Sequence, residues 1–374
     1  MAGIYLHVPF CKQRCTYCDF HFSTRFEGYR AELIEAIKRE IQLRKDELSE
    51  EIQTIYFGGG TPSLLMEKEL SEILEAIFSN YSVHSNAEIT LEANPEDIHL
   101  ETLQFWKKNG INRLSIGVQS FRETDIAWMN RGHHPNESLA AVRLAQELGF
   151  ENITVDLIYG LPELSLAEWK SHLEQVVDLN IQHISAYCLT VEPKTALNHQ
   201  IKIGKIKTPD EEQQSQQFEY MLSFLESKGF EQYEISNFAR NQNYSQHNSS
   251  YWKGVKYIGI GPSAHSFNGK ARRWNIANNT VYYKNVGKND EWFDTEILSP
   301  NDRWNELFLT GLRTKWGVSK IQLLALGGFT SNEENALEQF KHDLLVTETE
   351  KAILLTPKGK LQADGIAQVF FRVD

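Results

Sequence analysis

The chain has 374 residues, a formal net charge of −12 at pH 7 and a hydrophobic fraction of 41%. This length predicts one large domain and a smaller one. The negative charge argues against non-specific binding of nucleic acid or of an anionic membrane as the main activity. No apolar run is long enough for stable membrane insertion, and the first expected strand begins too early for a signal peptide. Because three of the four cysteines are clustered and a reducing compartment keeps thiols free, we expect a cytoplasmic protein.

Strand-like and helix-like segments alternate about every thirty residues. The apolar, β-branched runs that predict strands are 4–8, 54–57, 89–91, 114–118, 153–158 and 184–189. Amphipathic helical patterns separate them, which predicts a parallel sheet covered by helices. Six strands are too few for an eight-stranded barrel. We therefore expect an α/β fold, a partial (β/α)6 barrel, with ligands at the C-terminal ends of its strands.

Three cysteines form a cluster close to the beginning of the chain. Cys11, Cys15 and Cys18 follow the spacing Cys-x3-Cys-x2-Cys, and Cys188 is far away in the sequence. A structural zinc site requires four ligands, whereas three thiolates on a [4Fe–4S] cluster leave one iron open. The amino and carboxylate groups of S-adenosylmethionine can bind that iron. A half zinc site or unrelated buried thiols are the alternatives.

Polar and glycine-rich segments follow the expected strands. The second strand ends in Gly58-Gly59-Gly60-Thr61-Pro62, whose glycines let a backbone approach a ligand or simply form a tight turn. The next three strands end near Glu92, Gln119 and Asp156. Each of these side chains could cap the following helix, but three of them around one barrel mouth favour a ligand site.

Tyr17 completes a Cys-x3-Cys-x-aromatic-Cys pattern, and residues 5–11 read Tyr-Leu-His-Val-Pro-Phe-Cys. On these motifs the whole chain resembles the oxygen-independent coproporphyrinogen III oxidase family of radical S-adenosylmethionine (radical SAM) proteins. The resemblance implies that Cys11, Cys15 and Cys18 hold a [4Fe–4S] cluster. It also implies that Tyr5 and Gly59 lie near S-adenosylmethionine, and that Gly60 and Thr61 line the position of a second one. The polar residues that it places around the cofactor are Glu92, Gln119, Arg131 and Asp156.

Two departures from the oxidase pattern indicate a particular branch of the family. Phe20 stands where the oxidase has a fourth cysteine, and the long N-terminal extension of the oxidase has no counterpart before His7. Residues 233–239 and the His-Asn-x-x-Tyr-Trp motif at 247–252 match the HemW-type branch. This resemblance implies a haem chaperone that delivers haem to apo-enzymes, including respiratory ones, with at most peripheral contact at membranes. The rival is an oxygen-independent coproporphyrinogen III dehydrogenase of porphyrin biosynthesis, an activity that we do not expect.

His247 is the candidate haem ligand, because imidazole is the commonest protein ligand of haem iron. Tyr251 and Trp252 offer flat surfaces on which a porphyrin could stack. The alternative is a loop histidine bonded to neighbouring backbone, with Trp252 anchoring the loop. His265 is the next candidate.

Three segments are expected along the chain. Residues 1–235 form the radical SAM partial barrel, 236–290 a connecting segment with the His-Asn-x-x-Tyr-Trp motif, and 291–374 a C-terminal helical domain. The last segment combines helical patterns with a strand and turn near 352–359, which resembles a winged helix. Its helices are not notably basic, so we expect packing or partner docking rather than nucleic-acid binding.

Overall fold

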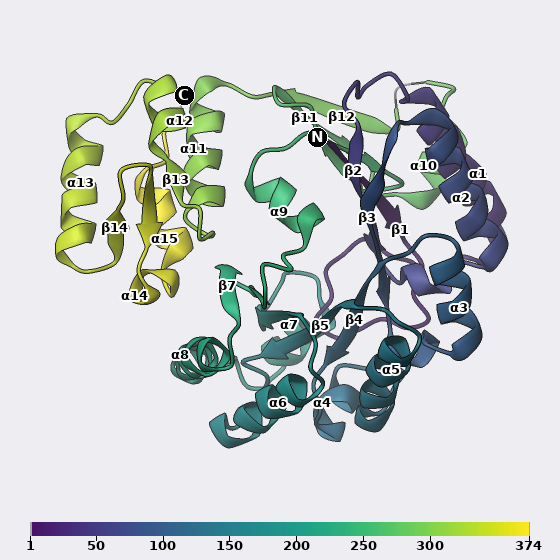
Figure 1. Ribbon diagram of the computed structural model, residues 1–374, viewed down its shortest axis with the longest axis horizontal. Helices are drawn as coiled ribbons and strands as arrows, with labels where there is room; N and C mark the ends of the chain where they lie inside the picture. Colours follow the sequence, from purple (N-terminus) through teal and green to yellow (C-terminus); the bar gives the residue numbers. More distant parts are fainter. Residues whose placement is uncertain (1, 290, 374) are drawn as a thin grey trace.

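Six parallel strands form the centre of the molecule (Figure 1). The computed structural model describes residues 2–289 and 291–373. The six strands hydrogen-bond to one another in chain order. They are β1 (Ala2–Val8), β2 (Ile52–Gly59), β3 (Val83–Ala93), β4 (Arg113–Gln119), β5 (Asn152–Tyr159) and β6 (His183–Cys188). Each expected strand lies inside one of these six, except that the last, 184–189, extends one residue beyond β6, so the expected partial barrel is confirmed.

Helices follow the strands and cover the outside of the sheet (Figure 1). The α-helices up to residue 230 are α1 (Arg30–Leu43), α2 (Glu67–Asn80), α3 (Leu100–Lys108), α4 (Glu123–Trp128), α5 (Pro135–Glu147), α6 (Leu166–Asp178), α7 (Ala196–Lys202) and α8 (Glu211–Ser227). Short 3-10 turns are η1 (Glu27–Tyr29), η2 (Pro62–Leu64) and η3 (Pro95–Asp97). Among the described residues, no helix combines the length and apolar character needed to cross a membrane.

The two faces of the sheet differ in chemistry. On β4, Leu114, Ile116 and Val118 are fully buried in the apolar core, whereas the alternate residues Arg113 and Ser115 line an internal cavity. Successive side chains of a strand point to opposite faces, so one strand supplies both surfaces. The apolar face holds the helices in place and leaves the inner face free for polar groups.

Both edges of the parallel sheet are extended by shorter strands. Next to β6 lie β8 (Asn237–Ala239) and β7 (Glu231–Glu234), and next to β1 lies β9 (Tyr257–Ile260). Beyond β9 the order is β10 (His265–Phe267), β11 (Ala271–Asn275) and β12 (Phe293–Ile297), with α10 (Asn279–Asn285) in between along the chain. The segment expected to be a connection, 236–290, therefore adds strands to both edges. The large sheet also continues past residue 290, because β12 pairs with β11.

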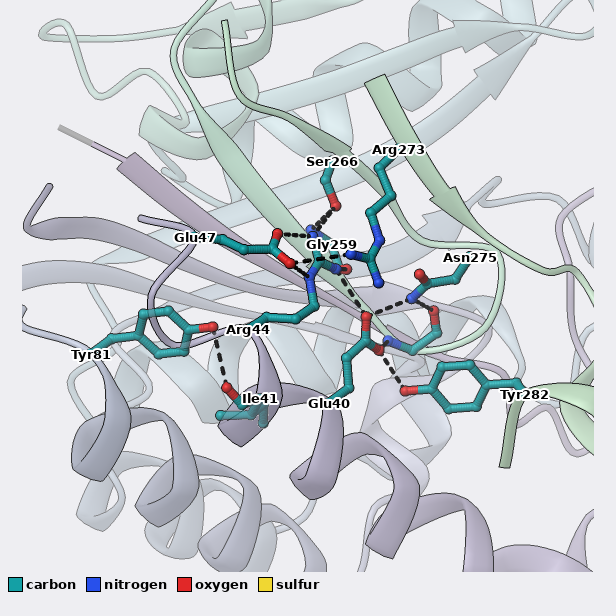
Figure 2. A network of polar contacts seen from close by, with 11 residues as sticks. Glu40, Ile41, Arg44, Glu47, Tyr81, Gly259, Ser266, Arg273, Asn275 and Tyr282 are labelled. Carbon is teal, nitrogen blue, oxygen red and sulfur yellow. Dashed lines mark hydrogen bonds and ion pairs between the residues drawn. The ribbon is translucent and has the colours of Figure 1, made fainter. Parts of the chain in front are cut away.

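A buried polar network fastens α1 to the strands beyond β1 (Figure 2). Glu40 and Arg44 form an ion pair at 2.9 Å, and both side chains are almost fully buried. Arg44 donates to the Gly259 carbonyl at 2.7 Å, and Glu40 accepts from the Tyr282 hydroxyl at 2.6 Å and from the Asn275 amide at 2.8 Å. Because each charged atom has several partners, the network can hold these elements together without a stray buried charge.

The C-terminal unit has a hydrophobic core of its own. Trp304, Phe308, Val318 and Phe370 are among its buried residues, and the Trp304 indole donates to the Phe370 carbonyl at 2.7 Å. Its elements are α11 (Pro300–Gly311), β13 (Val318–Ser319), α12 (Lys320–Ala325), α13 (Ser331–His342), β14 (Val346–Glu348), β15 (Ala352–Leu355), α14 (Pro357–Lys360) and α15 (Ala363–Val369). Three short strands in the order β13-β15-β14 accompany the helices. This arrangement agrees with the expected helical domain with a small β-wing.

Candidate functional site

A cavity of about 410 Å³ opens at the carboxyl ends of the parallel strands and extends into the barrel. Most of the site residues expected from the sequence line this one cavity. They are Cys11, Cys15, Cys18, Gly59, Gly60, Thr61, Glu92, Gln119, Arg131 and Asp156. These residues come from β1 to β5 and the loops after them, so the parallel register of the sheet brings them together.

The cysteine loop follows β1 and forms one wall of the cavity. All three cysteines are free thiols that are partly exposed. The Thr61 hydroxyl lies 3.5 Å from the Cys11 sulfur, and an Arg131 nitrogen lies 3.7 Å from the Cys15 sulfur. Burial raises the pKa of Cys11 to about 11 and that of Cys18 to about 12. Soft sulfur ligands with a cation beside them fit an iron–sulfur cluster, whose binding would release the thiol protons.

Arg131 is held rigidly between the cysteine loop and the strands. One terminal nitrogen donates to the Asn94 side-chain oxygen at 2.6 Å and to the Gly117 carbonyl at 2.9 Å. Its Nε atom is buried and has no hydrogen-bond partner among the described residues. A planar guanidinium with a free donor is suited to an anionic group of a ligand.

Two carboxyl groups also face the cavity, that of Glu92 from β3 and that of Asp156 from β5. Burial, together with the negative charge of Asp156, raises the pKa of Glu92 to about 8, although a hydrogen bond from Tyr56 lowers it. Burial also raises the pKa of Asp156 to about 6. Asp156 accepts a hydrogen bond from the Ser115 hydroxyl at 2.9 Å. A positively charged ligand between these carboxyl groups would favour their ionised forms.

Glycines are required at the end of β2 because other residues of the chain pack closely against Gly59 and Gly60. Gly59 has a φ of +92°, and a Cβ built there would lie 2.6 Å from the His7 ring. A Cβ on Gly60 would lie 2.7 Å from the Phe10 carbonyl oxygen. From the sequence we expected these glycines to let the backbone approach a ligand. In the structure they also let the end of β2 approach the start of the cysteine loop. Gln119 has a φ of +68°, a strained conformation of the kind that occurs at functional sites.

Tyr5 and His247 are the expected site residues that do not line the cavity. His247 lies in a helix, α9 (Gln246–Trp252), and not in a loop, and its side chain is buried with 1% of its surface exposed. Its Nδ1 atom is 2.7 Å from the Thr54 hydroxyl and its Nε2 atom 2.8 Å from the Tyr251 hydroxyl. Tyr5 stacks on His247 with ring centroids 6.3 Å apart.

Two capping interactions explain why this segment is helical. The Ser245 hydroxyl accepts from the Asn248 N–H at 3.3 Å, and the Glu88 carboxylate accepts from the N–H groups of Gln246 and His247. These contacts satisfy backbone donors at the first turn. The bonds to Glu88 also fix α9 to β3. Burial lowers the pKa of His247 to about 3, so its ring is neutral.

The other residues of the haem hypothesis are more accessible. The Arg313 guanidinium lies 5.6 Å from the centroid of the Trp252 ring, which connects α9 to the C-terminal unit. His265 is exposed at the beginning of β10 and stacks on Trp274 at 6.2 Å.

Several cavity residues were not expected from the sequence. Tyr56, Arg113, Ser115, Ser185 and Tyr187 all line the cavity from inward positions on β2, β4 and β6. A polar residue at every second position of an otherwise apolar strand would have indicated them.

The comparison with known proteins agrees with this geometry. A model of the Radical SAM superfamily matches residues 5–176. The protein named Heme chaperone HemW of Bacillus subtilis (strain 168) is 32% identical over 375 residues, which covers 99% of each chain. The chain belongs to the HemW family of radical SAM proteins. Another HemW relative, from Escherichia coli (strain K12), is 36% identical over 268 residues, covering 70% of this chain and 69% of the relative.

A solved structure outside the HemW relatives is also similar. Coproporphyrinogen III oxidase from Escherichia coli, described as a radical SAM enzyme, matches with a TM-score of 0.85 and 25% identity. The match covers 99% of this chain and 89% of the oxidase. This chain and the oxidase therefore share one architecture from the barrel to the C-terminal unit.

Proposed function

We propose that this protein is a haem chaperone that binds haem and passes it to haem-dependent apo-enzymes, respiratory ones among them. The observation that carries the proposal is its similarity, over nearly the whole length, to relatives named as haem chaperones. Cys11, Cys15 and Cys18 would hold a [4Fe–4S] cluster, and S-adenosylmethionine would bind in the same cavity. We expect the protein to act in the cytoplasm and to contact a membrane only peripherally, where an acceptor enzyme lies in that membrane.

Different residues of the cavity would bind the cluster and S-adenosylmethionine. A [4Fe–4S] cluster supplies electron transfer and an open iron when it is bound. Arg131 would offset thiolate charge beside Cys15, and its free Nε atom would donate to a carboxylate. Glu92 and Asp156 would face the cationic part of S-adenosylmethionine, while Gln119 and the segment 59–61 close the wall around it.

His247 remains our candidate for the haem iron ligand. Its Nε2 atom would exchange the hydrogen bond with Tyr251 for iron, and α9 would have to move outward to admit the porphyrin. The neutral ring suits this role, because a metal binds the unprotonated imidazole nitrogen. Tyr251 and Trp252 would then provide the stacking surfaces.

Haem titration of the purified protein tests the proposal. We expect about one haem per chain and a Soret band typical of nitrogen-ligated iron. His247→Ala should shift or weaken the band and slow transfer to an apo-acceptor. Tyr251→Phe is the matched control, because it frees Nε2 without removing the imidazole, and it should retain the band. If His247→Ala keeps the wild-type spectrum while His265→Ala loses it, His265 is the ligand.

The rival function is oxygen-independent dehydrogenation of coproporphyrinogen III, which the similarity to the oxidase structure favours. Phe20 argues against it, because this side chain stands in place of the oxidase's fourth cysteine. Phe20 is 68% exposed at the rim of the cavity. It would leave the site less completely enclosed than radical chemistry on a substrate requires.

A further inference from the structure

Each cysteine sulfur of the cluster loop has a hydrogen-bond donor beside it. The Thr61 hydroxyl lies 3.5 Å from the Cys11 sulfur, and an Arg131 nitrogen lies 3.7 Å from the Cys15 sulfur. The Cys18 sulfur accepts from the backbone N–H two residues later. These donors differ in kind, since one is a neutral hydroxyl, one a charged guanidinium and one a backbone amide. The loop therefore presents sulfurs that already have donors directed at them.

The side chain of Thr61 stands at a helix N-cap but does not serve as a cap. Thr61 precedes η2, where a threonine hydroxyl commonly accepts from a backbone N–H of the helix. Its side chain makes no such capping bond among the described residues. Thr61 lines the cavity and is 7% exposed. A buried hydroxyl is unfavourable without a partner, and the Cys11 sulfur supplies one.

The backbone holds this hydroxyl in place. The Gly60 N–H donates to the Val8 carbonyl at 2.9 Å, which fixes the segment to the residues just before the cysteine loop. Pro62 follows and disfavours the helical region for Thr61, whose φ is −140° and ψ is 88°. Thr61 is also β-branched, so its side chain has few accessible rotamers. The donor is thus oriented toward Cys11 before any cluster binds.

A hydrogen bond to a cluster sulfur changes how easily the cluster is reduced. An external donor of low potential adds one electron, and hence one negative charge, to a [4Fe–4S] cluster, while no bond forms or breaks. A hydrogen-bond donor directed at a sulfur stabilises the more negative state more strongly. It therefore raises the reduction potential.

We propose that the Thr61 hydroxyl donates to the Cys11 thiolate and raises the reduction potential of the cluster. This inference rests on the [4Fe–4S] assignment within the proposed function and adds a redox role at the same site. It differs from the role that the family resemblance implies for Thr61, which is contact with a second S-adenosylmethionine. A hydroxyl has one proton to donate, so the proton shared with the sulfur is not available to such a ligand.

The test is an EPR-monitored redox titration of the reconstituted protein without S-adenosylmethionine. Thr61→Val replaces the hydroxyl by a methyl group of similar size and should lower the reduction potential. At a fixed solution potential, the ratio of reduced to oxidised cluster should fall about threefold or more, which corresponds to at least about 28 mV for one electron. Thr61→Ser keeps the hydroxyl and should stay close to the wild-type potential.

Thr90→Val is the matched control for this substitution. The Thr90 hydroxyl is buried on β3 and has no hydrogen-bond partner in the part of the chain that the structure describes. Thr90 does not line the cavity, so the control removes a buried hydroxyl without touching a cluster sulfur. It should leave the potential unchanged. Iron content and thermal unfolding show whether each variant holds the cluster and is folded.

Each outcome decides a different point. If the wild-type protein assembles no [4Fe–4S] cluster, the cluster assignment and this inference both fall. If the cluster assembles and Thr61→Val keeps the wild-type potential, only the role of Thr61 is wrong. A weaker affinity of that variant for S-adenosylmethionine would then assign the hydroxyl to this ligand. If Thr61→Ser lowers the potential as much as Thr61→Val, packing of the methyl group is the cause, and the proposal is again wrong.

A further variant covers the case in which Thr61→Val holds no cluster. Thr61→Ala also lacks the hydroxyl and should then show the lowered potential, while Thr61→Ser does not. If Thr61→Val and Thr61→Ala both fold without a cluster and Thr61→Ser retains it, the hydroxyl is needed for cluster assembly, which contradicts the proposed effect on the potential.

Discussion

The Tyr56 hydroxyl lies 2.7 Å from a carboxylate oxygen of Glu92, and both side chains face the cavity. The tyrosine donates, so this hydrogen bond stabilises the ionised carboxylate. Burial and the charge of Asp156 act in the opposite direction and outweigh it, which leaves the pKa of Glu92 at about 8. Near neutral pH and without ligand, Glu92 is therefore largely protonated.

Replacing Glu92 by glutamine should change how stability depends on pH. Between pH 4.5, the ordinary pKa of the group, and about 8, the folded protein keeps a proton that the unfolded chain has lost. The free energy of unfolding must therefore fall as pH rises through this interval, by about 1.4 kcal/mol for each unit of pKa shift that is realised. Glu92→Gln should remove this contribution in urea unfolding without S-adenosylmethionine, most clearly between pH 6 and 8, above the pKa of Asp156. Glu101→Gln, which changes an exposed carboxylate on α3, is the control and should leave it unchanged.

The cysteine loop predicts the metal content of the protein. Anaerobic reconstitution should yield about four iron and four sulfide per chain, and S-adenosylmethionine should alter the EPR signal of the reduced cluster. Replacing Cys11, Cys15 and Cys18 together by alanine should abolish both. Cys188, at the end of β6, lines the same cavity, so Cys188→Ala is the comparison: it should leave the iron and sulfide content unchanged if the three cysteines of the loop alone hold the cluster. One tightly bound zinc and no uptake of iron would refute the cluster assignment.

The strand-end residues Gln119 and Asp156 should determine affinity for S-adenosylmethionine. Loss of a hydrogen bond to a charged ligand costs about 1.5–3 kcal/mol, which corresponds to roughly ten- to a hundredfold in affinity. Gln119→Ala and Asp156→Ala should therefore weaken binding in calorimetric titration while the iron content stays constant. Unchanged affinity in both variants would mean that these side chains serve the local structure only.

The Glu40–Arg44 pair should be important for stability. Removing Glu40 leaves the Arg44 charge buried, so Glu40→Ala should lower the free energy of unfolding by about 3–5 kcal/mol. Glu47 also pairs with Arg44, at 2.8 Å, but its side chain is 40% exposed. Glu47→Ala should accordingly cost about 1 kcal/mol or less. Equal effects of the two substitutions in urea unfolding would show that burial of the pair is not the cause.

Hydrophobic periodicity was sufficient to locate the central strands. Each of them is an apolar run that packs under helices, and this burial leaves a clear pattern in the sequence. The edge strands β8 and β10 have three residues each, too few to show any period. They form because β6 and β9 offer unpaired edges, which is a tertiary effect. The extension of the large sheet to β12 was missed because four of the five residues of this strand are exposed, so that it leaves no apolar run in the sequence.

The position of His247 was harder to predict, although a signal existed. Ser245 precedes the motif as a helix N-cap, and His247 and Tyr251 have the i, i+4 spacing of one helix face. These features indicate a helix. The position of the imidazole depends on two distant partners: Thr54 on β2 bonds to the ring, and Glu88 on β3 accepts from the backbone N–H of His247. Contacts between residues so far apart in the chain leave no local pattern.

The most direct test of the account offers the reconstituted protein both alternatives in parallel under anaerobic conditions. One sample receives haem and then an apo-haem enzyme, and the other receives coproporphyrinogen III, S-adenosylmethionine and a reductant. We predict that haem binds, at about one per chain, and restores activity to the acceptor, while no protoporphyrinogen IX forms. Sustained formation of protoporphyrinogen IX by a protein that transfers no haem would contradict the account.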